Sequence, residues 1–199
     1  MTEVRGFECL TTDECNAIAA KVREMRHLWW DRGLFYTLGA ASYIDDMNVY
    51  YTMAQLYNPH LSSAFYDMDA FQKVRTKLED VFEDHVMVSP HLALPGFHIF
   101  DKRANGKQGS VHEDTQYDRI GAPEYTETIT FTLPVEIPKV GAGLNYNYEF
   151  VPYELGHLYT HDGLTTHQIA QCGDLEDDMR ITIQGHGLRL KSGGILVYW

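Results

Sequence analysis

Residues 127–135 read ETITFTLPV, a run in which threonine alternates with isoleucine, phenylalanine and leucine. Successive side chains of a β-strand point to opposite faces of a sheet, so this alternation predicts a strand with one apolar face. The chain from Val86 onward has a similar texture, because short apolar or alternating runs are separated by glycine, proline and asparagine. We therefore expect strands at residues 92–100, 109–115, 127–135, 143–150, 157–159, 167–170, 179–190 and 195–198.

Turn signals separate several of these strands. Residues 103–107 contain the dipeptide Asn-Gly, and residues 138–143 and 191–194 contain paired or closely spaced glycines. Eight strands with little helix between them predict a double-sheet jelly roll or a barrel.

The first third of the chain has helical patterns. Residues 11–14 (TTDE) offer capping oxygens ahead of apolar residues at helical spacing, and residues 68–84 contain a second apolar stripe. We expect these helices to pack on one side of the sheet. The chain is thus predicted to be a single domain, with a mostly helical flanking region at 1–85 and a β core at 86–199.

Length and composition fit a compact protein. The 199 residues include 44% hydrophobic side chains, enough for one sizeable core. No run of about eighteen apolar residues occurs, and the first residues lack the apolar segment of a secretory signal. Three irregularly spaced cysteines do not form a disulfide framework, so a cytoplasmic location is expected.

The net charge of −12 argues against two classes of partner. A field of this sign repels the phosphates of nucleic acids and the head groups of anionic membranes. We therefore expect neither nucleic acid nor membrane as a partner. The oligomeric state stays open, with a homodimer as one expectation.

His112, Asp114 and His167 are candidate metal ligands. On a strand, side chains two positions apart share a face, so His112 and Asp114 can offer an imidazole and a carboxylate to one point. His167 opens a later predicted strand, where a rigid backbone can hold a third ligand. Two histidines and one carboxylate, with other positions left open, are typical of non-haem Fe(II) oxygenases.

Arg180 and Thr182 share one face of the predicted strand 179–190, and Gln184 and His186 continue that face. An arginine that points into a barrel is costly unless it meets an anion. A planar guanidinium suits a bidentate carboxylate, and the hydroxyl of Thr182 can add a hydrogen bond. This pattern predicts a site for a dicarboxylic acid.

The order of these motifs resembles that of the Fe(II)- and 2-oxoglutarate-dependent dioxygenases. The resemblance covers roughly residues 94–190 and includes the strand and turn that precede His167. The segments that carry it are 95–99 (PGFHI), 112–114 (HED), 128–134 (TITFTLP), 141–144 (GAGL) and 180–182 (RIT).

The resemblance implies a double-stranded β-helix, which is the jelly-roll, cupin-like core of that superfamily, flanked here by the N-terminal helices. His112, Asp114 and His167 would bind Fe(II), while Arg180, helped by Thr182, would hold the distal carboxylate of 2-oxoglutarate. Dioxygen would be the second cosubstrate, and the products would be succinate, CO2 and an oxidised substrate. Related halogenases carry a small residue in place of the carboxylate, so Asp114 favours hydroxylation or a related oxidation.

Other residues have weaker assignments. His161 is the rival of His167 as a ligand, but we expect it in the turn at residues 162–163, and its distance in sequence from Arg180 is longer than usual for the family. His98, Tyr117 and Tyr146 are candidate substrate contacts, although each also fits ordinary packing in a sheet.

A chain of this length has little sequence left for recognition of a folded protein. We therefore expect a small-molecule substrate, such as a free amino acid or a natural-product intermediate. The cations that the sequence offers for a carboxylate of the substrate are Arg32, Arg103, Lys107 and Arg119, and nothing in the sequence chooses among them.

Two other classes of function fit parts of the pattern. A cupin-like dioxygenase or isomerase would use the same metal ligands without 2-oxoglutarate, and Arg180 would then hold the carboxylate of its substrate. A non-enzymatic jelly-roll binding module would leave His112 and Asp114 as surface residues without a metal.

Overall fold

The computed structural model describes residues 3–173, 175 and 179–199. Its strands are β1 (Arg5–Glu8), β2 (Trp30–Asp31), β3 (Tyr36–Leu38), β4 (Val86–Val88), β5 (Gly96–Phe100), β6 (Tyr125–Glu136), β7 (Gly143–Tyr146), β8 (Glu149–Pro152), β9 (His157–His161), β10 (His167–Ile169), β11 (Arg180–Leu190) and β12 (Ile195–Tyr198). Its α-helices are α1 (Thr12–Glu24), α2 (Met47–Ala64) and α3 (Ala70–Phe82), and its 3-10 turns are η1 (Arg26–Leu28), η2 (Tyr66–Met68), η3 (Lys102–Ala104) and η4 (Gln116–Asp118). The described residues are thus mainly β, with helices concentrated in the N-terminal part as predicted.

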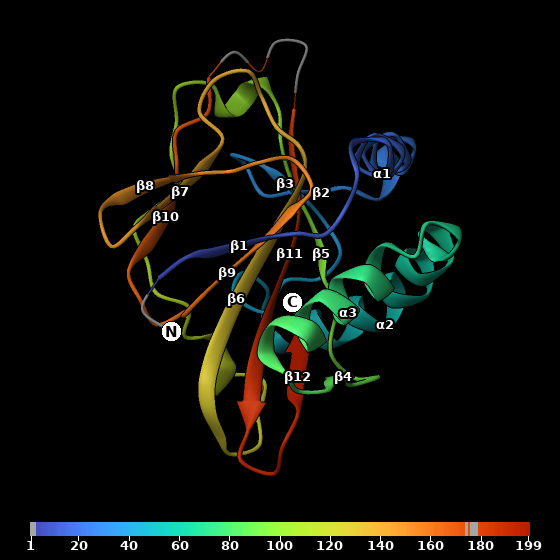
Figure 1. The fold of residues 1–199 in the computed structure, drawn as a ribbon. Coiled ribbons are helices and arrows are strands. Elements are labelled where there is room, and N and C mark those ends of the chain that lie inside the picture. Colours follow the sequence, from blue (N-terminus) through green and yellow to red (C-terminus); the bar gives the residue numbers. More distant parts are fainter. Residues whose placement is uncertain (1–2, 174, 176–178) are drawn as a thin grey trace.

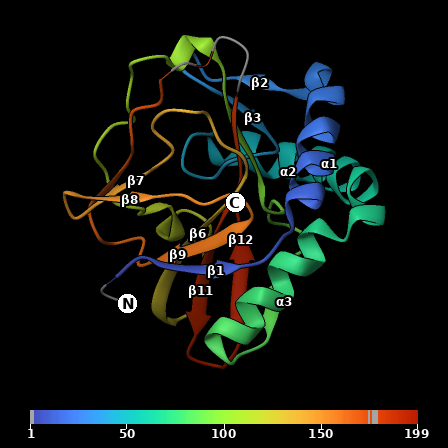
Figure 2. The same cartoon turned by 45° about the horizontal axis from the view of Figure 1, so that its top comes forward.

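The strands of the described residues form two sheets. The larger has nine strands, in the order β1-β9-β6-β11-β5-β3-β2, with β12 paired to β11 and β4 to β12. The smaller has the order β10-β7-β8. All these pairings are antiparallel except that of β4 with β12. Figure 2 shows β1 alongside β9 at one edge of the larger sheet.

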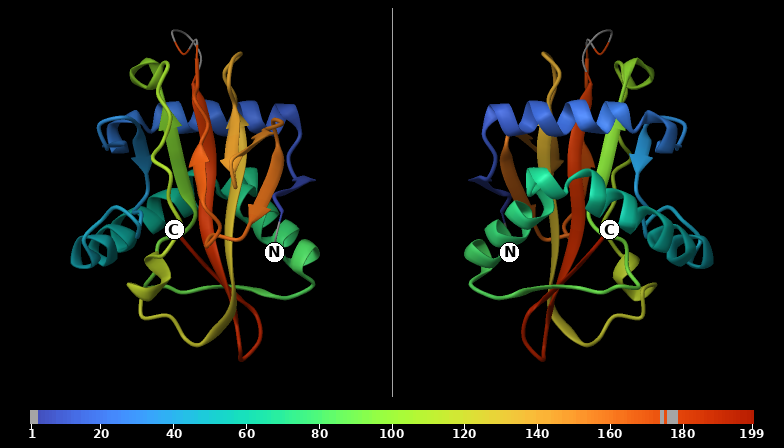
Figure 3. Two further views of the ribbon diagram at one scale, coloured as in Figure 1. Left: turned by 90° about the vertical axis from the view of Figure 1, so that its left-hand side faces the viewer. Right: turned by 90° about the vertical axis from the view of Figure 1, so that its right-hand side faces the viewer.

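The three helices and the smaller sheet lie on opposite sides of the larger sheet (Figure 1). Figure 3 shows α1 crossing the strands on the helical side. The prediction that the helices pack on one side of a sheet is therefore confirmed.

The alternation along β6 and β11 explains these layers. The apolar residues Ile129, Phe131 and Leu133 of β6 join the main core together with Ile181 and Ile183 of β11. Residues of α1 and α3 belong to the same core cluster, so the helices bury this face. The other face of β6 and β11 is polar and lines a cavity. One sequence pattern thus builds both the core and a wall of the candidate site.

Two helices lie where the sequence predicts them. The side chains of Thr11 and Glu14 each accept a hydrogen bond from the other residue's backbone N–H at the start of α1, which is a capping box. The apolar stripe at residues 68–84 forms α3. No helix in the described part of the chain is long and apolar enough to cross a bilayer.

Some predictions were incomplete or wrong. α2 was not predicted, nor were the short strands β1 to β4. Residues 143–150 form a hairpin rather than one strand, because Asn147 and Tyr148 adopt φ values of 48° and 67° and reverse the chain.

The prediction of a strand at residues 109–115 was also wrong. This segment is a loop. It contacts the smaller sheet through an isolated β-bridge between His112 and His167. Its only large apolar side chain is Val111, so it has no alternating apolar face to bury as a strand.

Candidate active site

A cavity of about 540 Å³ opens against the polar face of the larger sheet. The walls come from β6, β10 and β11, from the loop at residues 109–116, and from the N-terminal segment at residues 32–44. The candidate metal ligands and the candidate cosubstrate arginine all line this one space.

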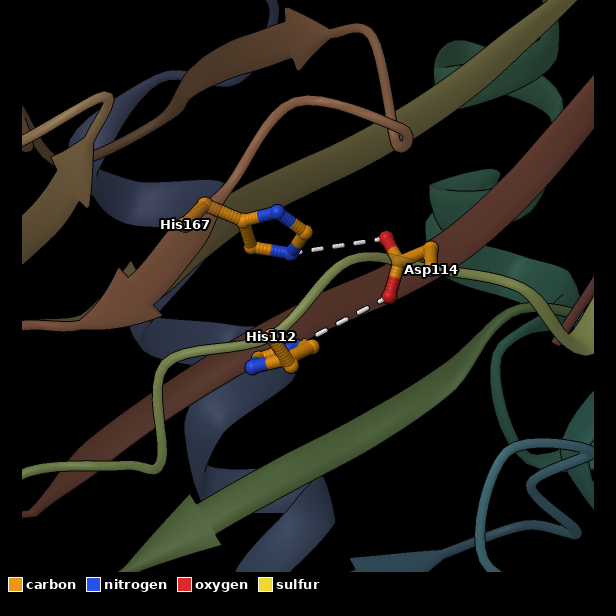
Figure 4. A group of neighbouring side chains, drawn as sticks. All are labelled: His112, Asp114 and His167. Carbon is orange, nitrogen blue, oxygen red and sulfur yellow. Dashed lines mark ion pairs between the residues drawn. The ribbon is translucent and has the colours of Figure 1, made fainter.

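His112, Asp114 and His167 converge in the cavity, with ligand atoms that all lie within 4.8 Å of one another (Figure 4). Nε2 of His167 is 3.5 Å from Oδ2 of Asp114, and Nε2 of His112 is 3.8 Å from Oδ1. Asp114 and His167 are buried, whereas His112 is exposed toward solvent. These three residues form the one group of potential metal ligands found among the described residues.

Backbone hydrogen bonds bring the three residues together even though His112 and Asp114 are not on a strand. The N–H of His112 donates to the carbonyl of His167 at 3.0 Å, and the N–H of His167 donates back at 2.9 Å. The N–H of Asp114 donates to the carbonyl of Gly163 at 2.7 Å. The loop at residues 109–116 is therefore fixed against β10 and the turn that precedes it.

Hydrogen bonds also orient both imidazoles. Nδ1 of His112 is 2.8 Å from the carbonyl oxygen of Ser110, and Nδ1 of His167 is 2.8 Å from that of Thr165. A carbonyl only accepts, so each Nδ1 carries a proton, and in the neutral form of each ring the lone pair is on Nε2. These Nε2 atoms face Asp114, which is the orientation that a metal ion needs.

The carboxylate of Asp114 is held by a polar chain from the larger sheet. The hydroxyl of Thr130 donates to Oδ2 of Asp114 at 2.5 Å, and Nδ1 of His186 lies 3.2 Å from the same hydroxyl. Burial raises the pKa of Asp114, but the neighbouring His186 and His167 and the hydrogen bond from Thr130 outweigh it, so the net pKa is lowered. The carboxylate is therefore ionised and ready to bind a cation.

Gly163 allows this close arrangement. A Cβ atom at this position would lie 2.8 Å from Oγ1 of Thr130 and 3.1 Å from Cβ of Asp114. The turn after β9 therefore needs a glycine in order to pass behind the carboxylate.

Arg180 is a buried cation on the cavity wall, only 2% exposed. Its guanidinium lies 5.5 Å from the ring centre of Phe100 and 5.3 Å from that of Tyr153, and Nη1 donates to Sγ of Cys172 at 3.8 Å. Nε has no hydrogen-bond partner, and no carboxylate of the described residues pairs with this arginine. A buried guanidinium in this state fits an anionic ligand.

The polar face of β11 reaches the cavity through Arg180, Gln184 and His186. Thr182 is fully buried between them and does not line the cavity. The hydroxyl-bearing residues Thr132 and Tyr153 do line it, and they were not identified from the sequence. Burial raises the pKa of Tyr153, so its phenol stays protonated.

Of the three candidate substrate contacts, only His98 lines the cavity. Its Nε2 is hydrogen-bonded to the hydroxyl of Tyr43, and burial together with the nearby Arg180 lowers its pKa to about 3. The ring of Tyr146 packs against His161 outside the cavity lining, and Tyr117 packs against Tyr125. Neither tyrosine is among the residues that line the cavity.

His161 lies at the end of β9 rather than in the following turn, so its predicted place was wrong. It is 1% exposed, and its ring centre is 4.7 Å from that of His167. Burial lowers its pKa to about 4. It lines the cavity and supports His167, but it is not one of the three converging residues.

Several cavity residues were missed by sequence reasoning. They include Phe35, Tyr43, Gln116 and Thr130, and His186 was placed on the face of Arg180 without a role in the site. For Thr130 and His186 a signal existed, because both continue the polar alternation of β6 and β11. Phe35, Tyr43 and Gln116 come from loops or short turns whose position depends on tertiary packing.

No protein-family model and no curated protein matches this chain. Solved structures do match it. An N-substituted L-amino acid dioxygenase from Burkholderia ambifaria aligns with a TM-score of 0.63 at 11% identity, covering 99% of this chain and 86% of that one.

The α-ketoglutarate-dependent non-haem epimerase SnoN from nogalamycin biosynthesis aligns with a TM-score of 0.57 at 11% identity, covering 94% of this chain and 80% of that one. HygX from Streptomyces hygroscopicus, solved with nickel and 2-oxoglutarate bound, aligns with a TM-score of 0.57 at 9% identity, covering 93% and 82%. At such identities the likeness shows the fold. The chain therefore has the fold of these three proteins.

Proposed function

We propose that this protein is an Fe(II)- and 2-oxoglutarate-dependent oxygenase that oxidises a small molecule. One observation carries most of the weight. His112, Asp114 and His167 converge in the same cavity as a buried arginine that has no carboxylate partner among the described residues. The first group suits a divalent metal ion, and the second suits an organic anion.

The three converging side chains fit Fe(II). Two imidazoles with oriented Nε2 atoms and one ionised carboxylate form the set that leaves open positions in non-haem iron oxygenases. The outer hydrogen bonds that Thr130 donates to Asp114 and that the two imidazoles donate to backbone carbonyls hold these groups in place before any metal arrives.

Arg180 would hold the distal carboxylate of 2-oxoglutarate. Its planar guanidinium can form a bidentate pair, and its buried position makes that pair strong. We assign the accompanying hydroxyl contacts to Thr132 and Tyr153, because these residues line the cavity whereas Thr182 does not. Thr182 would support Arg180 through the packing of β11.

When bound, Fe(II) would let dioxygen react with 2-oxoglutarate, giving succinate and CO2 and transferring the second oxygen atom to the substrate. The chain itself would position the reactants. Thr130 keeps Asp114 fixed and ionised, and the hydrogen-bonded pair of Tyr43 and His98 gives the cavity a neutral wall near Arg180. The presence of Asp114 favours oxygen transfer over halogenation.

The proposed substrate is a small molecule, such as a free amino acid or a natural-product intermediate. A cavity of about 540 Å³ is in the usual range for small ligands, and both 2-oxoglutarate and the substrate must share it. The amino acid substrate named for the Burkholderia protein is compatible with this size class.

We further propose that residues 1–199 work as one dioxygenase domain with a jelly-roll core. Phe35 and Tyr43, from the N-terminal region, line the same cavity as Arg180 and His167 from the β core. The two sheets, antiparallel except for the pairing of β4 with β12, support the jelly-roll assignment. We also keep the cytoplasm as the proposed location.

Succinate release tests this function. The protein would be incubated with Fe(II), 2-oxoglutarate, ascorbate and air, with candidate substrates added. We expect succinate from the parent and none above background from His167→Ala, while His157→Ala, which alters a half-buried histidine on β9, should behave like the parent. Metal binding without any use of 2-oxoglutarate would instead indicate the cupin-like enzyme, and absence of metal binding would indicate a binding module.

A further inference from the structure

We propose that Arg119 and Gln116 bind a carboxylate group of the substrate. This inference rests on the proposed function and names the chemical class of its substrate as a carboxylic acid. The two side chains line the cavity from a segment that is separate from Arg180, so they offer a second position for an anion.

The structure eliminates the other cations that the sequence offers for this role. Arg32 donates from Nη1 and Nη2 to the two carboxylate oxygens of Asp45, at 2.6 and 3.0 Å, and from Nε to Thr37 at 3.0 Å. Every nitrogen of this guanidinium therefore has a partner within the chain.

Arg103 and Lys107 are also unsuitable. Arg103 pairs with Asp31 at 2.9 Å and with Asp101 at 3.0 Å. Lys107 is exposed and does not line the cavity. Arg119 is the remaining member of the set.

Arg119 is oriented without being neutralised. Nη1 donates to the carbonyl of Ser42 at 3.0 Å, and Nη2 donates to the carbonyl of Asp45 at 2.9 Å. Carbonyl oxygens fix the plane of the guanidinium but do not cancel its charge. In the part of the chain that the structure describes, no carboxylate pairs with Arg119, and three of its five N–H donors stay available.

The side chain of Asp45, whose backbone carbonyl accepts from Arg119, already has its own partners. The carboxylate of Asp45 accepts the two hydrogen bonds from Arg32 and a third from the backbone N–H of Ala41 at 2.9 Å. The ion pair of Arg32 and Asp45 is therefore neutral as a unit, and the exposed guanidinium of Arg119 bonds to carbonyl oxygens beside it and to no carboxylate of the described residues.

Gln116 supplies a second, independent sign of a ligand. It is 4% exposed and lines the cavity, yet its amide Nε2 has no hydrogen-bond partner. Gln116 begins η4, and the N–H of Arg119 donates to its carbonyl at 2.9 Å. Side chains three residues apart on a 3-10 turn lie on the same side, so the amide and the guanidinium are presented together.

The two groups suit a carboxylate. A carboxylate has two oxygens that only accept hydrogen bonds, and here an amide N–H₂ and a planar guanidinium both only donate through their nitrogens. A primary carboxamide in place of the acid has one acceptor oxygen fewer and no charge. Its N–H₂ group would also face the donors of Gln116 and Arg119. The site should therefore distinguish an acid from its own carboxamide.

Calorimetry can test this discrimination without knowledge of the natural substrate. The probes are the proteinogenic L-amino acids and their N-acetyl derivatives, each beside its matching primary carboxamide. They are titrated into protein loaded with Ni(II) and 2-oxoglutarate, with Ni(II) used to prevent turnover. We expect at least one acid to bind, and its carboxamide to bind at least tenfold more weakly.

The variants assign the effect to residues. Arg119→Gln and Gln116→Leu should each weaken the acid at least tenfold, and Arg119→Lys should lie between them and the parent. Lys107→Gln removes the same charge outside the cavity and should change nothing. Thermal melting checks that each variant is folded, and Arg119→Lys, which keeps the charge, serves as the test if Arg119→Gln unfolds.

Equal affinities for acid and carboxamide, an unchanged acid affinity in Arg119→Gln, or no binding of any acid at millimolar concentration would overturn the inference. The affinity for 2-oxoglutarate, measured first on the same sample, reads out the proposed function separately. Failure of that first titration counts against the oxygenase assignment. The comparison of acid and carboxamide is then made on the metal-free protein, where it still decides the role of Arg119.

Discussion

The hydroxyl of Thr130 on β6 donates a 2.5 Å hydrogen bond to Oδ2 of Asp114, which lies in a loop of the opposite wall. Thr130 is 1% exposed, and its hydroxyl oxygen also lies 3.2 Å from Nδ1 of His186. The larger sheet therefore holds the carboxylate of Asp114 through the hydroxyl of Thr130, while Nδ1 of His186 on β11 lies 3.6 Å from the same carboxylate oxygen.

Replacement of Thr130 by valine should weaken binding of Fe(II) by about 10- to 100-fold, because an outer hydrogen bond that orients a ligand typically contributes this much. Anaerobic competition with a chelator measures the change. Thr128→Val is the matched control, since Thr128 lies on the same strand but donates to Asp162 at 2.6 Å. Equal affinities in the two variants would contradict the role given to Thr130.

Asp114→Ala should abolish stoichiometric binding of Fe(II), because it removes the one anionic member of the converging group. Glu113→Ala is the control that tests whether a neighbouring carboxylate also acts as a metal ligand. Glu113 is exposed and accepts a hydrogen bond from the hydroxyl of Thr166. Metal content after gel filtration, measured by mass spectrometry, gives the answer. Retention of one equivalent of metal by Asp114→Ala would remove this residue from the proposed site.

Arg180→Gln should weaken binding of 2-oxoglutarate by at least about 30-fold, because the dicarboxylate would lose its charged, buried partner. Arg180→Lys should recover only part of the affinity, since an ammonium cannot form the bidentate pair. Arg189→Gln, at the far end of β11, breaks ion pairs with Asp84 and Glu127 and is the control for loss of an arginine from this strand. An affinity for 2-oxoglutarate that is the same in Arg180→Gln and Arg189→Gln would refute the assignment.

The buried His98 should make the metal-free protein less stable at mildly acidic pH. Its pKa falls from 6.5 to about 3 on folding, so the unfolded chain binds the proton more readily. The contribution of neutral His98 to the free energy of unfolding is therefore fully present above pH 6.5, and it is lost as the pH falls toward 3. By linkage, its loss between pH 7.5 and pH 5.5 is about 1.4 kcal/mol.

Urea unfolding at these two pH values, with EDTA present, measures that loss. His98→Gln should reduce the pH dependence of the free energy of unfolding by about 1.4 kcal/mol relative to the parent. His91→Gln alters an exposed histidine and should leave the dependence unchanged. A parent and a His98→Gln variant with the same pH dependence would show that His98 is not held neutral by burial.

The parts of the fold that the sequence predicted are those where one segment carries its own signal. The alternation at 127–135 and 179–190 matches β6 and β11, and the capping residues at 11–14 begin α1. α2 also has buried residues at helical spacing, namely Tyr50, Ala54, Tyr57 and Leu61, but its tyrosines and the internal Pro59 obscured the pattern. The short strands β2 and β3 have too few residues for any periodicity.

The sequence predicted those site residues that belong to motifs in a recognisable order along the chain. His112, Asp114 and His167 do converge, although they do so through a loop and paired backbones rather than through strand alternation. Thr132 was missed although it continues the polar alternation of β6, as Thr130 does. Tyr153 and Gln116 were missed because their place in the cavity depends on how distant segments pack. Arg119 could be chosen only after the structure showed that Arg32 and Arg103 form ion pairs within the chain. No local sequence pattern encodes those contacts.

Anaerobic calorimetry of 2-oxoglutarate binding tests the central claim, which is that one cavity holds the metal and the cosubstrate together. The account predicts one equivalent of 2-oxoglutarate bound by the Fe(II)-loaded parent, binding at least tenfold weaker without metal, and no metal-dependent gain in His167→Ala. Binding of 2-oxoglutarate that is absent from the Fe(II)-loaded parent, or equally strong with and without metal, would contradict it.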